Sequence, residues 1–369
     1  MVFGKTHQTK LRGPGPIMSR TTKKRAAGTN VENCPADISA IADWMESNIG
    51  VSTARIEVKK FAGGQSNPTF KVDCEGGAFV LRTKPQGPTL KGAHAVDREA
   101  RVQKALRTTG FPVPEIYGFC DDESLIGSPF YMMEMVEGRI FWDACLPEID
   151  PSLRASYYSE LVQVLARLHT VDFEQIGLND YGPTGAYVAR QLFRWVSQYK
   201  DDEVAGRNEH MDRLADWLPF NVPDDDETCL IHGDFRLDNV IFHPTECRIL
   251  SVLDWELSTL GNPIADFAYH LMMYRLPSSL VAGLRGVDLK ANSLPSERDY
   301  VAQYKMISQR KSLPHLDYYV TFNLFRFAAI VHGIKGRAIR GNATSDQASR
   351  LIGLLPEIAR IACEQIDLA

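Results

Sequence analysis

Three polar residues with a fixed spacing could together carry out a phosphoryl transfer. Asp234 closes a His-Gly-Asp run, Asn239 follows it after five residues and Asp254 after twenty. A magnesium-dependent phosphoryl transfer needs a carboxylate that orients and deprotonates the attacking hydroxyl, and oxygen donors that hold the metal on the nucleotide. We therefore predict that Asp234 is the catalytic base and that Asn239 and Asp254 are Mg²⁺ ligands.

A glycine pair further upstream suits the phosphates of a nucleotide. Gly63 and Gly64 lie between two expected strands, so the backbone amides of this loop could close over phosphates. Ser66 and Asn67 add side-chain donors directly after the glycines. Two glycines alone would equally suit a plain hairpin, and their place ahead of a strand that carries a cation favours the phosphate loop.

That cation is Arg82. Val80 and Arg82 share one face of an expected strand because side chains alternate along a strand. The guanidinium fork of an arginine can bind both a carboxylate such as Glu99 and a phosphate. Lys84 lies on the same face and remains an alternative phosphate-binding residue. An ordinary surface ion pair also remains open.

Hydrophobic periodicity and turn residues indicate the elements that must position these side chains. Towards the N-terminus we expect helices over 38–49 and 96–106, and strands over 54–62, 69–74, 78–83, 115–120 and 130–135. Beyond Pro151 the chain is mostly helical, interrupted by strands over 228–231, 239–243 and 248–254. The fold class is therefore α+β, with a small antiparallel sheet and one packed helix (37–135) followed by a larger, mainly helical lobe (136–369).

Composition favours an intracellular protein without a membrane span. Of the 369 residues 44% are apolar and 24% are charged, and the net charge is −5. The seven cysteines form no Cys-x-x-Cys pair, which suits a reducing compartment. There is no apolar run of about 18 residues and no signal-peptide pattern, so we expect a cytoplasmic location.

The first 36 residues form a basic arm in this interpretation. Residues 1–25 carry seven Lys or Arg and no acid, and a Gly-Pro-Gly-Pro run at 13–16 breaks any amphipathic helix. A solvated arm is the favoured interpretation. Contact with a nucleic acid or a membrane surface, or import into an organelle, stays open for the arm, and we expect no nucleic-acid partner for the whole protein.

Taken together, the motifs resemble those of the aminoglycoside phosphotransferase and choline kinase family, a bilobal relative of the protein kinases. Within that family the chain is similar to the kinase-like domain fused to some acyl-CoA dehydrogenases. The residues that carry the resemblance are 61–67, 80–82, 98–99, 232–239 and 253–266. The resemblance implies ATP and Mg²⁺ as cofactors, a bracing role for His232 and an anchoring role for Asp266. It also places the hinge at 133–136, where the carbonyl of Glu134 and the amide of Val136 would bind adenine.

The acceptor is the least determined part of the prediction. Seven basic residues oppose only Asp317 between positions 305 and 340, namely Lys305, Arg310, Lys311, Arg326, Lys335, Arg337 and Arg340. This excess suits a small anionic substrate that bears a hydroxyl group, with Arg326 and Arg337 as its contacts. Solvated helix faces are the alternative.

The resemblance implies a hydroxyacyl-CoA as that acceptor. An aminoglycoside phosphotransferase and a nucleotide-binding pseudokinase that scaffolds a partner remain open. A protein kinase is less favoured because the chain has neither an Asp-Phe-Gly nor an Ala-Pro-Glu motif. The sequence does not determine whether ATP or GTP is used, or the oligomeric state.

Overall fold

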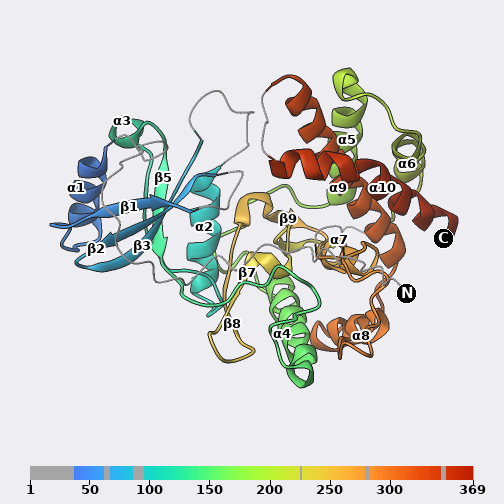
Figure 1. Ribbon diagram of the computed structural model, residues 1–369, viewed down its shortest axis with the longest axis horizontal. Coiled ribbons are helices and arrows are strands. Elements are labelled where there is room, and N and C mark those ends of the chain that lie inside the picture. Colours follow the sequence, from blue (N-terminus) through green and yellow to red (C-terminus); the bar gives the residue numbers. More distant parts are fainter. Residues whose placement is uncertain are drawn as a thin grey trace, which may run out of the picture. The chain divides into compact units, whose positions relative to one another are not determined.

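A five-stranded antiparallel sheet forms the N-terminal part of the computed structural model (Figure 1). The structure describes residues 37–61, 67–85, 95–224, 227–278, 282–341 and 346–368. The strands run in the order β1-β2-β3-β5-β4. Their bounds are β1 Glu57–Lys60, β2 Thr69–Cys74, β3 Gly77–Thr83, β4 Ile116–Cys120 and β5 Phe130–Glu134.

Helices cover both faces of this sheet. The apolar residues of α1 (Ile38–Asn48) pack with Phe79 and Leu81 of β3, and the short α3 (Glu123–Ile126) joins the same cluster. Helix α2 (Val96–Arg107) packs with Val80 on the opposite face. Alternation along β3 therefore directs the side chain of Arg82, like that of Val80, towards α2.

Helices make up most of the rest of the chain. Asp150 caps α4, where its side chain accepts a hydrogen bond from the Ser152 amide at 2.8 Å, and Pro151 is the first helical residue. Helix α9 lies among α5, α7 and α10. The bounds are α4 Pro151–His169, α5 Tyr187–Asp201, α6 Glu209–Phe220, α7 Pro263–Leu271, α8 Glu297–Ile307, α9 Leu316–Ile339 and α10 Asp346–Leu368.

Two small strand pairs position the segments that carry the candidate site. Strand β6 (Cys229–Ile231) pairs with β9 (Thr259–Gly261), and β7 (Val240–Phe242) pairs with β8 (Ile249–Val252). The loop that carries Asp234 follows β6, and Asp254 lies two residues after β8. Short 3₁₀ turns complete these segments, η2 (Leu237–Asn239) before β7 and η3 (Trp255–Leu257) after β8.

The predicted α+β class and the small sheet are confirmed, whereas α3 and β9 were not expected. Residues 35–369 form one compact unit, and the lobe boundaries at 37–135 and 136–369 stay a prediction. The basic arm 1–36 and the residues Gly63, Gly64 and Ser66 lie outside the described residues.

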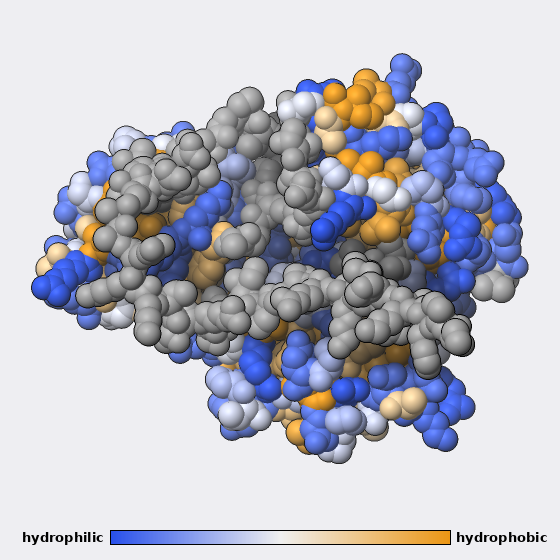
Figure 2. Space-filling model, in the orientation of Figure 1, coloured by the Kyte–Doolittle hydropathy of each residue, from blue (hydrophilic) through white to orange (hydrophobic). Residues whose placement is uncertain are grey.

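The polarity of the surface agrees with the burial of apolar side chains between the helices and the sheet. On the face drawn in Figure 2, the described surface is mostly hydrophilic, with smaller hydrophobic areas between. Within the part of the chain that the structure describes, none of the helices combines the length and the apolar character needed to cross a membrane.

Candidate active site

The loop after β6 holds Asp234 in a fixed position. Gly233 adopts a φ of +80°, and a Cβ on it would lie 2.6 Å from the carbonyl oxygen of Leu257, so only glycine fits there. The Gly233 amide donates to Asp266 Oδ1 at 2.8 Å, and the His232 amide donates to Asp266 Oδ2 at 2.9 Å. Asp266 thus binds two successive amides of the catalytic loop.

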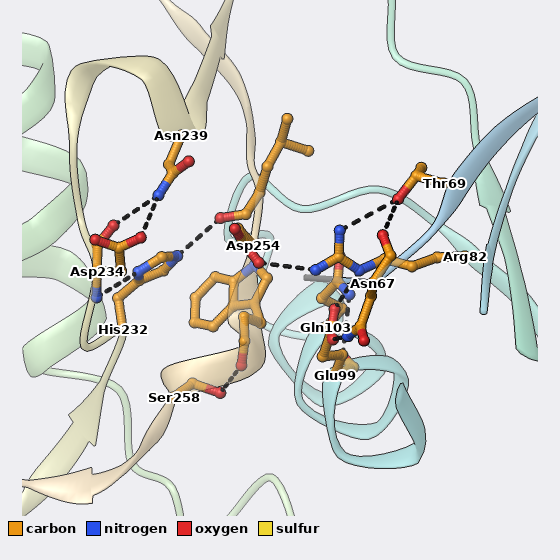
Figure 3. Close-up of polar contacts among 12 residues, drawn as sticks. Asn67, Thr69, Arg82, Glu99, Gln103, His232, Asp234, Asn239, Asp254 and Ser258 are labelled. Carbon is orange, nitrogen blue, oxygen red and sulfur yellow. Dashed lines mark hydrogen bonds and ion pairs between the residues drawn. The ribbon is translucent and has the colours of Figure 1, made fainter. Parts of the chain in front are cut away.

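His232 braces this loop through hydrogen bonds at both ring nitrogens. Its Nδ1 accepts the amide proton of Asp234 at 3.2 Å, so Nε2 carries the ring proton and donates it to the Leu253 carbonyl at 2.9 Å. Both ring nitrogens are therefore engaged by backbone groups. The ring links the Asp234 loop to the residue that precedes Asp254 (Figure 3), as the resemblance implied.

Both carboxylate oxygens of Asp234 have a donor. The Asn239 side-chain amide donates to Asp234 Oδ2 at 3.0 Å and to the Asp234 carbonyl at 2.8 Å. The hydroxyl of Tyr269 donates to Oδ1 in a short hydrogen bond, and Arg236 Nε lies 3.6 Å from the same oxygen. This arrangement orients the carboxylate as an acceptor for a substrate hydroxyl.

Asn239 and Asp254 provide oxygen donors that fit Mg²⁺. The amide nitrogen of Asn239 faces Asp234, so its side-chain oxygen points away from that carboxylate (Figure 3). Asp254 has a left-handed φ of +63°, uncommon for a residue other than glycine, and its side chain is 33% exposed. Among the described residues no cluster of three or more His, Cys, Asp or Glu could hold an ion. Mg²⁺ held by these two residues would also use nucleotide phosphates as ligands, its common mode of binding.

Arg82 connects the sheet, helix α2 and the metal-ligand segment. Its Nε lies 2.7 Å from Glu99 Oε2, and its Nη2 lies 2.8 Å from Asp254 Oδ1 (Figure 3). The strand register places Thr69 and Tyr131 on either side of Arg82, and Thr69 Oγ1 accepts from Nη1 at 3.3 Å. The expected Arg82–Glu99 pair is thus present, and its extension to Asp254 was not foreseen.

Burial and neighbouring charges shift the pKa values of Arg82 and Glu99 in opposite directions. Burial, the largest single effect, would lower the pKa of Arg82, but Glu99, Tyr131 and Asp254 together with Glu256 outweigh it and leave the pKa above its usual value. Burial raises the pKa of Glu99, which is 1% exposed, against the opposing effect of Arg82. Tyr131 and Asn67 each donate a hydrogen bond to the Glu99 carboxylate. Arg82 therefore remains charged, and Glu99 depends on its donors to be buried as a carboxylate.

The structure gives less direct information on the other predicted nucleotide contacts, which are Asn67, Glu134 and Val136. The side chain of Asn67 is buried and turned to Glu99, so in this structure it supports the ion pair. Glu134 ends β5, and Val136 follows it in a groove that Arg107 and Leu250 also line. The adenine contacts of Glu134 and Val136 stay a prediction.

Arg326 and Arg337 occupy very different environments on α9. Arg326 is 3% exposed, donates to the Gly233 carbonyl at 2.9 Å and lies over the Tyr269 ring at 5.2 Å. Arg337 is exposed, eleven residues further along and thus about 16 Å away along the helix axis. Only Arg326 touches the catalytic loop, and the substrate role of both residues stays a prediction.

Sequence reasoning missed Tyr269 and the cavity beside it. This cavity of ≈ 40 Å³ is lined by Tyr269, Arg236 and His270 and by the apolar residues Ala144, Leu237, Met272, Met273, Leu276, Ala282 and Phe327. The spacing of Asp266 and Tyr269 is a usable signal, because residues three apart share a helix face. Because Asp266 was expected to anchor the loop, Tyr269 on the same helix face could have been expected to face that loop as well.

Comparison with known proteins identifies the family. The family model described as phosphotransferase enzyme family matches residues 57–302, which is most of the chain. The chain belongs to this family. A provisionally named aminoglycoside phosphotransferase of Ralstonia eutropha JMP134 has a crystal structure that is 42% identical with a TM-score of 0.81, over 90% of this chain and 99% of that one. Choline kinase of Cryptosporidium parvum Iowa II is 12% identical with a TM-score of 0.61, over 90% and 97% of the two chains, and supports the fold alone.

Longer relatives of this chain contain a similar region. Mouse acyl-CoA dehydrogenase family member 10 is 40% identical over 326 residues, which cover 88% of this chain and 30% of the relative. Chicken acyl-CoA dehydrogenase family member 11 is 43% identical over 316 residues, which cover 84% and 40%. The chain thus spans less than half the length of these relatives. The predicted family, its kinase-like fold and the similarity to the domain in acyl-CoA dehydrogenases are confirmed.

Proposed function

We propose that this phosphotransferase uses ATP and Mg²⁺ to phosphorylate the hydroxyl group of a small anionic metabolite, a hydroxyacyl-CoA in particular. The observation that carries the proposal is the junction of Asp234, Asn239, Asp254 and Arg82 at one site. Asn239 contacts Asp234, and Arg82 reaches Asp254 from the sheet. A base, two oxygen ligands and a phosphate-binding cation are the parts that in-line transfer requires.

In this proposal each residue acts on a different part of the reaction. Asp234 accepts the proton of the acceptor hydroxyl as the hydroxyl oxygen attacks the γ-phosphate and the bond from the γ-phosphorus to ADP breaks, and Tyr269 and Asn239 keep the carboxylate oriented. Arg82 binds the α- and β-phosphates, held by Glu99. Bound Mg²⁺ would supply charge neutralisation on the phosphate oxygens, with Asn239 and Asp254 as its protein ligands.

The acceptor class is inferred from the surroundings of Asp234. The adjoining cavity is lined mainly by apolar side chains, with Arg236 as its charged member, and Arg326 lies behind the loop. Its ≈ 40 Å³ offers room for roughly three water molecules, enough for a short aliphatic segment next to the reacting hydroxyl. A polycation would instead meet Arg236 at this cavity, which disfavours an aminoglycoside.

One activity panel tests the proposal. The purified chain is incubated with Mg-ATP and either 4-hydroxyacyl-CoA thioesters or kanamycin-like aminoglycosides, and ADP release is measured beside the matched variant Asp234→Asn. We expect ADP release that depends on the thioester and on Asp234. Turnover of aminoglycosides alone would instead support the second candidate, which the 42% identical Ralstonia protein favours. ATP binding without turnover of any acceptor would support a pseudokinase.

A further inference from the structure

Helix α2 carries two neighbouring residues that bind opposite sides of the site. Glu99 holds Arg82 on the sheet side at 2.7 Å. Arg98, the residue before it, reaches the helical part of the protein, where its Nη2 donates to the Tyr181 carbonyl at 2.7 Å and lies 3.4 Å from the Ser258 carbonyl. The helix that presents Glu99 is thus tied to the C-terminal part of the fold by the adjacent side chain.

The contact of Arg98 is specific in geometry as well as in charge. Its guanidinium lies 4.2 Å from the centroid of the Tyr181 ring, and the Tyr181 hydroxyl shares a hydrogen bond with Ser258 Oγ. Tyr181 and Ser258 are both almost fully buried. A planar guanidinium can stack on a ring and donate to backbone carbonyls at the same time, which an ammonium group cannot do.

Ser258 is structurally linked to the predicted metal ligand. It ends the 3₁₀ turn that starts directly after Asp254, and both its amide and its Oγ donate to the Trp255 carbonyl, at 3.1 and 2.6 Å. Asp254 in turn contacts Arg82 at 2.8 Å. The contacts, together with the covalent chain between Asp254 and Ser258 and between Arg98 and Glu99, therefore form a closed ring that runs from Arg98 through Ser258, Asp254, Arg82 and Glu99 back to Arg98 (Figure 3 shows its members except Arg98).

We propose that Arg98 is a positioning residue for the nucleotide site. By fixing α2 against Tyr181 and Ser258, it holds Glu99 where Arg82 can reach both Asp254 and the nucleotide phosphates. Without this link α2 would still pack on the sheet through Val96 and Ala100, but its orientation relative to Asp254 would lose a constraint. The site is consequently assembled before the nucleotide binds. This inference rests on the proposed nucleotide-binding function.

The same helix offers a matched control for the test. Arg101 lies one turn further on, donates to the Gly177 carbonyl at 2.8 Å and forms an ion pair with Asp180. It therefore ties α2 to the segment just before Tyr181, but no contact links it to Ser258. Arg98→Met and Arg101→Met each remove one arginine tether, and only the first breaks the ring.

The experiment measures binding of Mg-AMP-PNP to the full chain by titration calorimetry, together with thermal unfolding. We expect Arg98→Met to weaken binding about tenfold, the effect typical of losing a residue that supports a metal or ligand site. Arg101→Met should stay within about twofold of wild type although a tether is lost, since losing one tether mainly affects stability. Arg98→Lys should fall between wild type and Arg98→Met, and it replaces Arg98→Met as the test if the latter does not fold.

Each outcome has a distinct meaning. Unchanged Mg-AMP-PNP affinity in Arg98→Met, or in Arg98→Lys where that variant stands in for it, overturns the positioning role. Equal weakening in Arg98→Met and Arg101→Met also overturns it, because the effect would then come from tethering α2 in general. Failure of the wild-type chain to bind Mg-AMP-PNP would instead contradict the proposed function itself.

Discussion

Replacing Arg82 by lysine tests whether this site needs an arginine. The two carboxylates that Arg82 binds come from different parts of the chain, Glu99 on α2 and Asp254 after β8, and separate nitrogens of the guanidinium reach them. A lysine keeps the positive charge but has a single terminal nitrogen. It would remain with the buried Glu99, because breaking a buried pair costs about 3–5 kcal/mol. The contact on the Asp254 side is then the one that is lost.

With its single nitrogen on Glu99, the lysine also lacks a second donor for the nucleotide phosphates, and the expected loss of affinity follows from that one hydrogen bond. A hydrogen bond to a charged group contributes about 1.5–3 kcal/mol, and every 1.4 kcal/mol changes an equilibrium constant tenfold. Arg82→Lys should therefore weaken Mg-AMP-PNP binding roughly 10- to 150-fold in titration calorimetry. Thermal unfolding should change little in comparison, because Glu99 keeps a cationic partner.

Lys84 supplies the control, because the sequence left it as the alternative phosphate contact. It forms no ion pair among the described residues, so Lys84→Met should change the affinity for Mg-AMP-PNP by less than about threefold. If Arg82→Lys bound Mg-AMP-PNP like wild type while Lys84→Met bound it poorly, the reasoning from the geometry of Arg82 would be refuted. Lys84 would then be the residue that grips the phosphates.

Three further predictions concern the base, the metal and pH. Asp234→Asn should slow ADP release about 10²- to 10⁴-fold in a coupled assay while Mg-AMP-PNP binding is kept, since general base catalysis contributes that much; loss of binding to the same degree would contradict this role. Asp254→Asn should raise the Mg²⁺ concentration for half-maximal ADP release at least about tenfold, and an unchanged Mg²⁺ titration would count against it as a ligand. Burial lowers the pKa of His270 to about 4, whereas the unfolded chain binds that proton near pH 6.5, so acid favours unfolding between these values. The free energy of unfolding in urea should consequently be about 2 kcal/mol lower at pH 5 than at pH 7, and His270→Gln should reduce this difference.

Local signals in the sequence were sufficient to predict the elements that hold the candidate site residues. The helix expected at 96–106 is observed as Val96–Arg107, and the strand expected at 228–231 as Cys229–Ile231. Alternation on β3 correctly placed Arg82 towards Glu99. These predictions succeeded because each depends on periodicity or turn residues within one short segment.

Pairing between distant segments could not be predicted in this way. The excess of positive charge between 305 and 340 looked uncompensated because only Asp317 lies in that stretch. In the structure Arg310 forms an ion pair with Glu227, and Arg340 binds both carboxylate oxygens of Asp202 at 2.8 Å. Part of the cluster is therefore neutralised by acids about a hundred residues away in sequence, which a sequence window does not show.

Arg326 was correctly singled out from the sequence, but its contacts in the structure were not predicted. Its place in an apolar helical stretch indicated a special role, because an arginine is seldom buried without a reason. The structure buries it against the Gly233 carbonyl and the Tyr269 ring, and no carboxylate forms an ion pair with it among the described residues. A buried cation that is stabilised by a carbonyl and a ring also places positive charge close to Asp234, because Tyr269 donates to that carboxylate. Arg326 can thus favour an anionic acceptor through its charge while its donors hold the loop of Asp234, and this electrostatic effect requires no direct contact with the substrate.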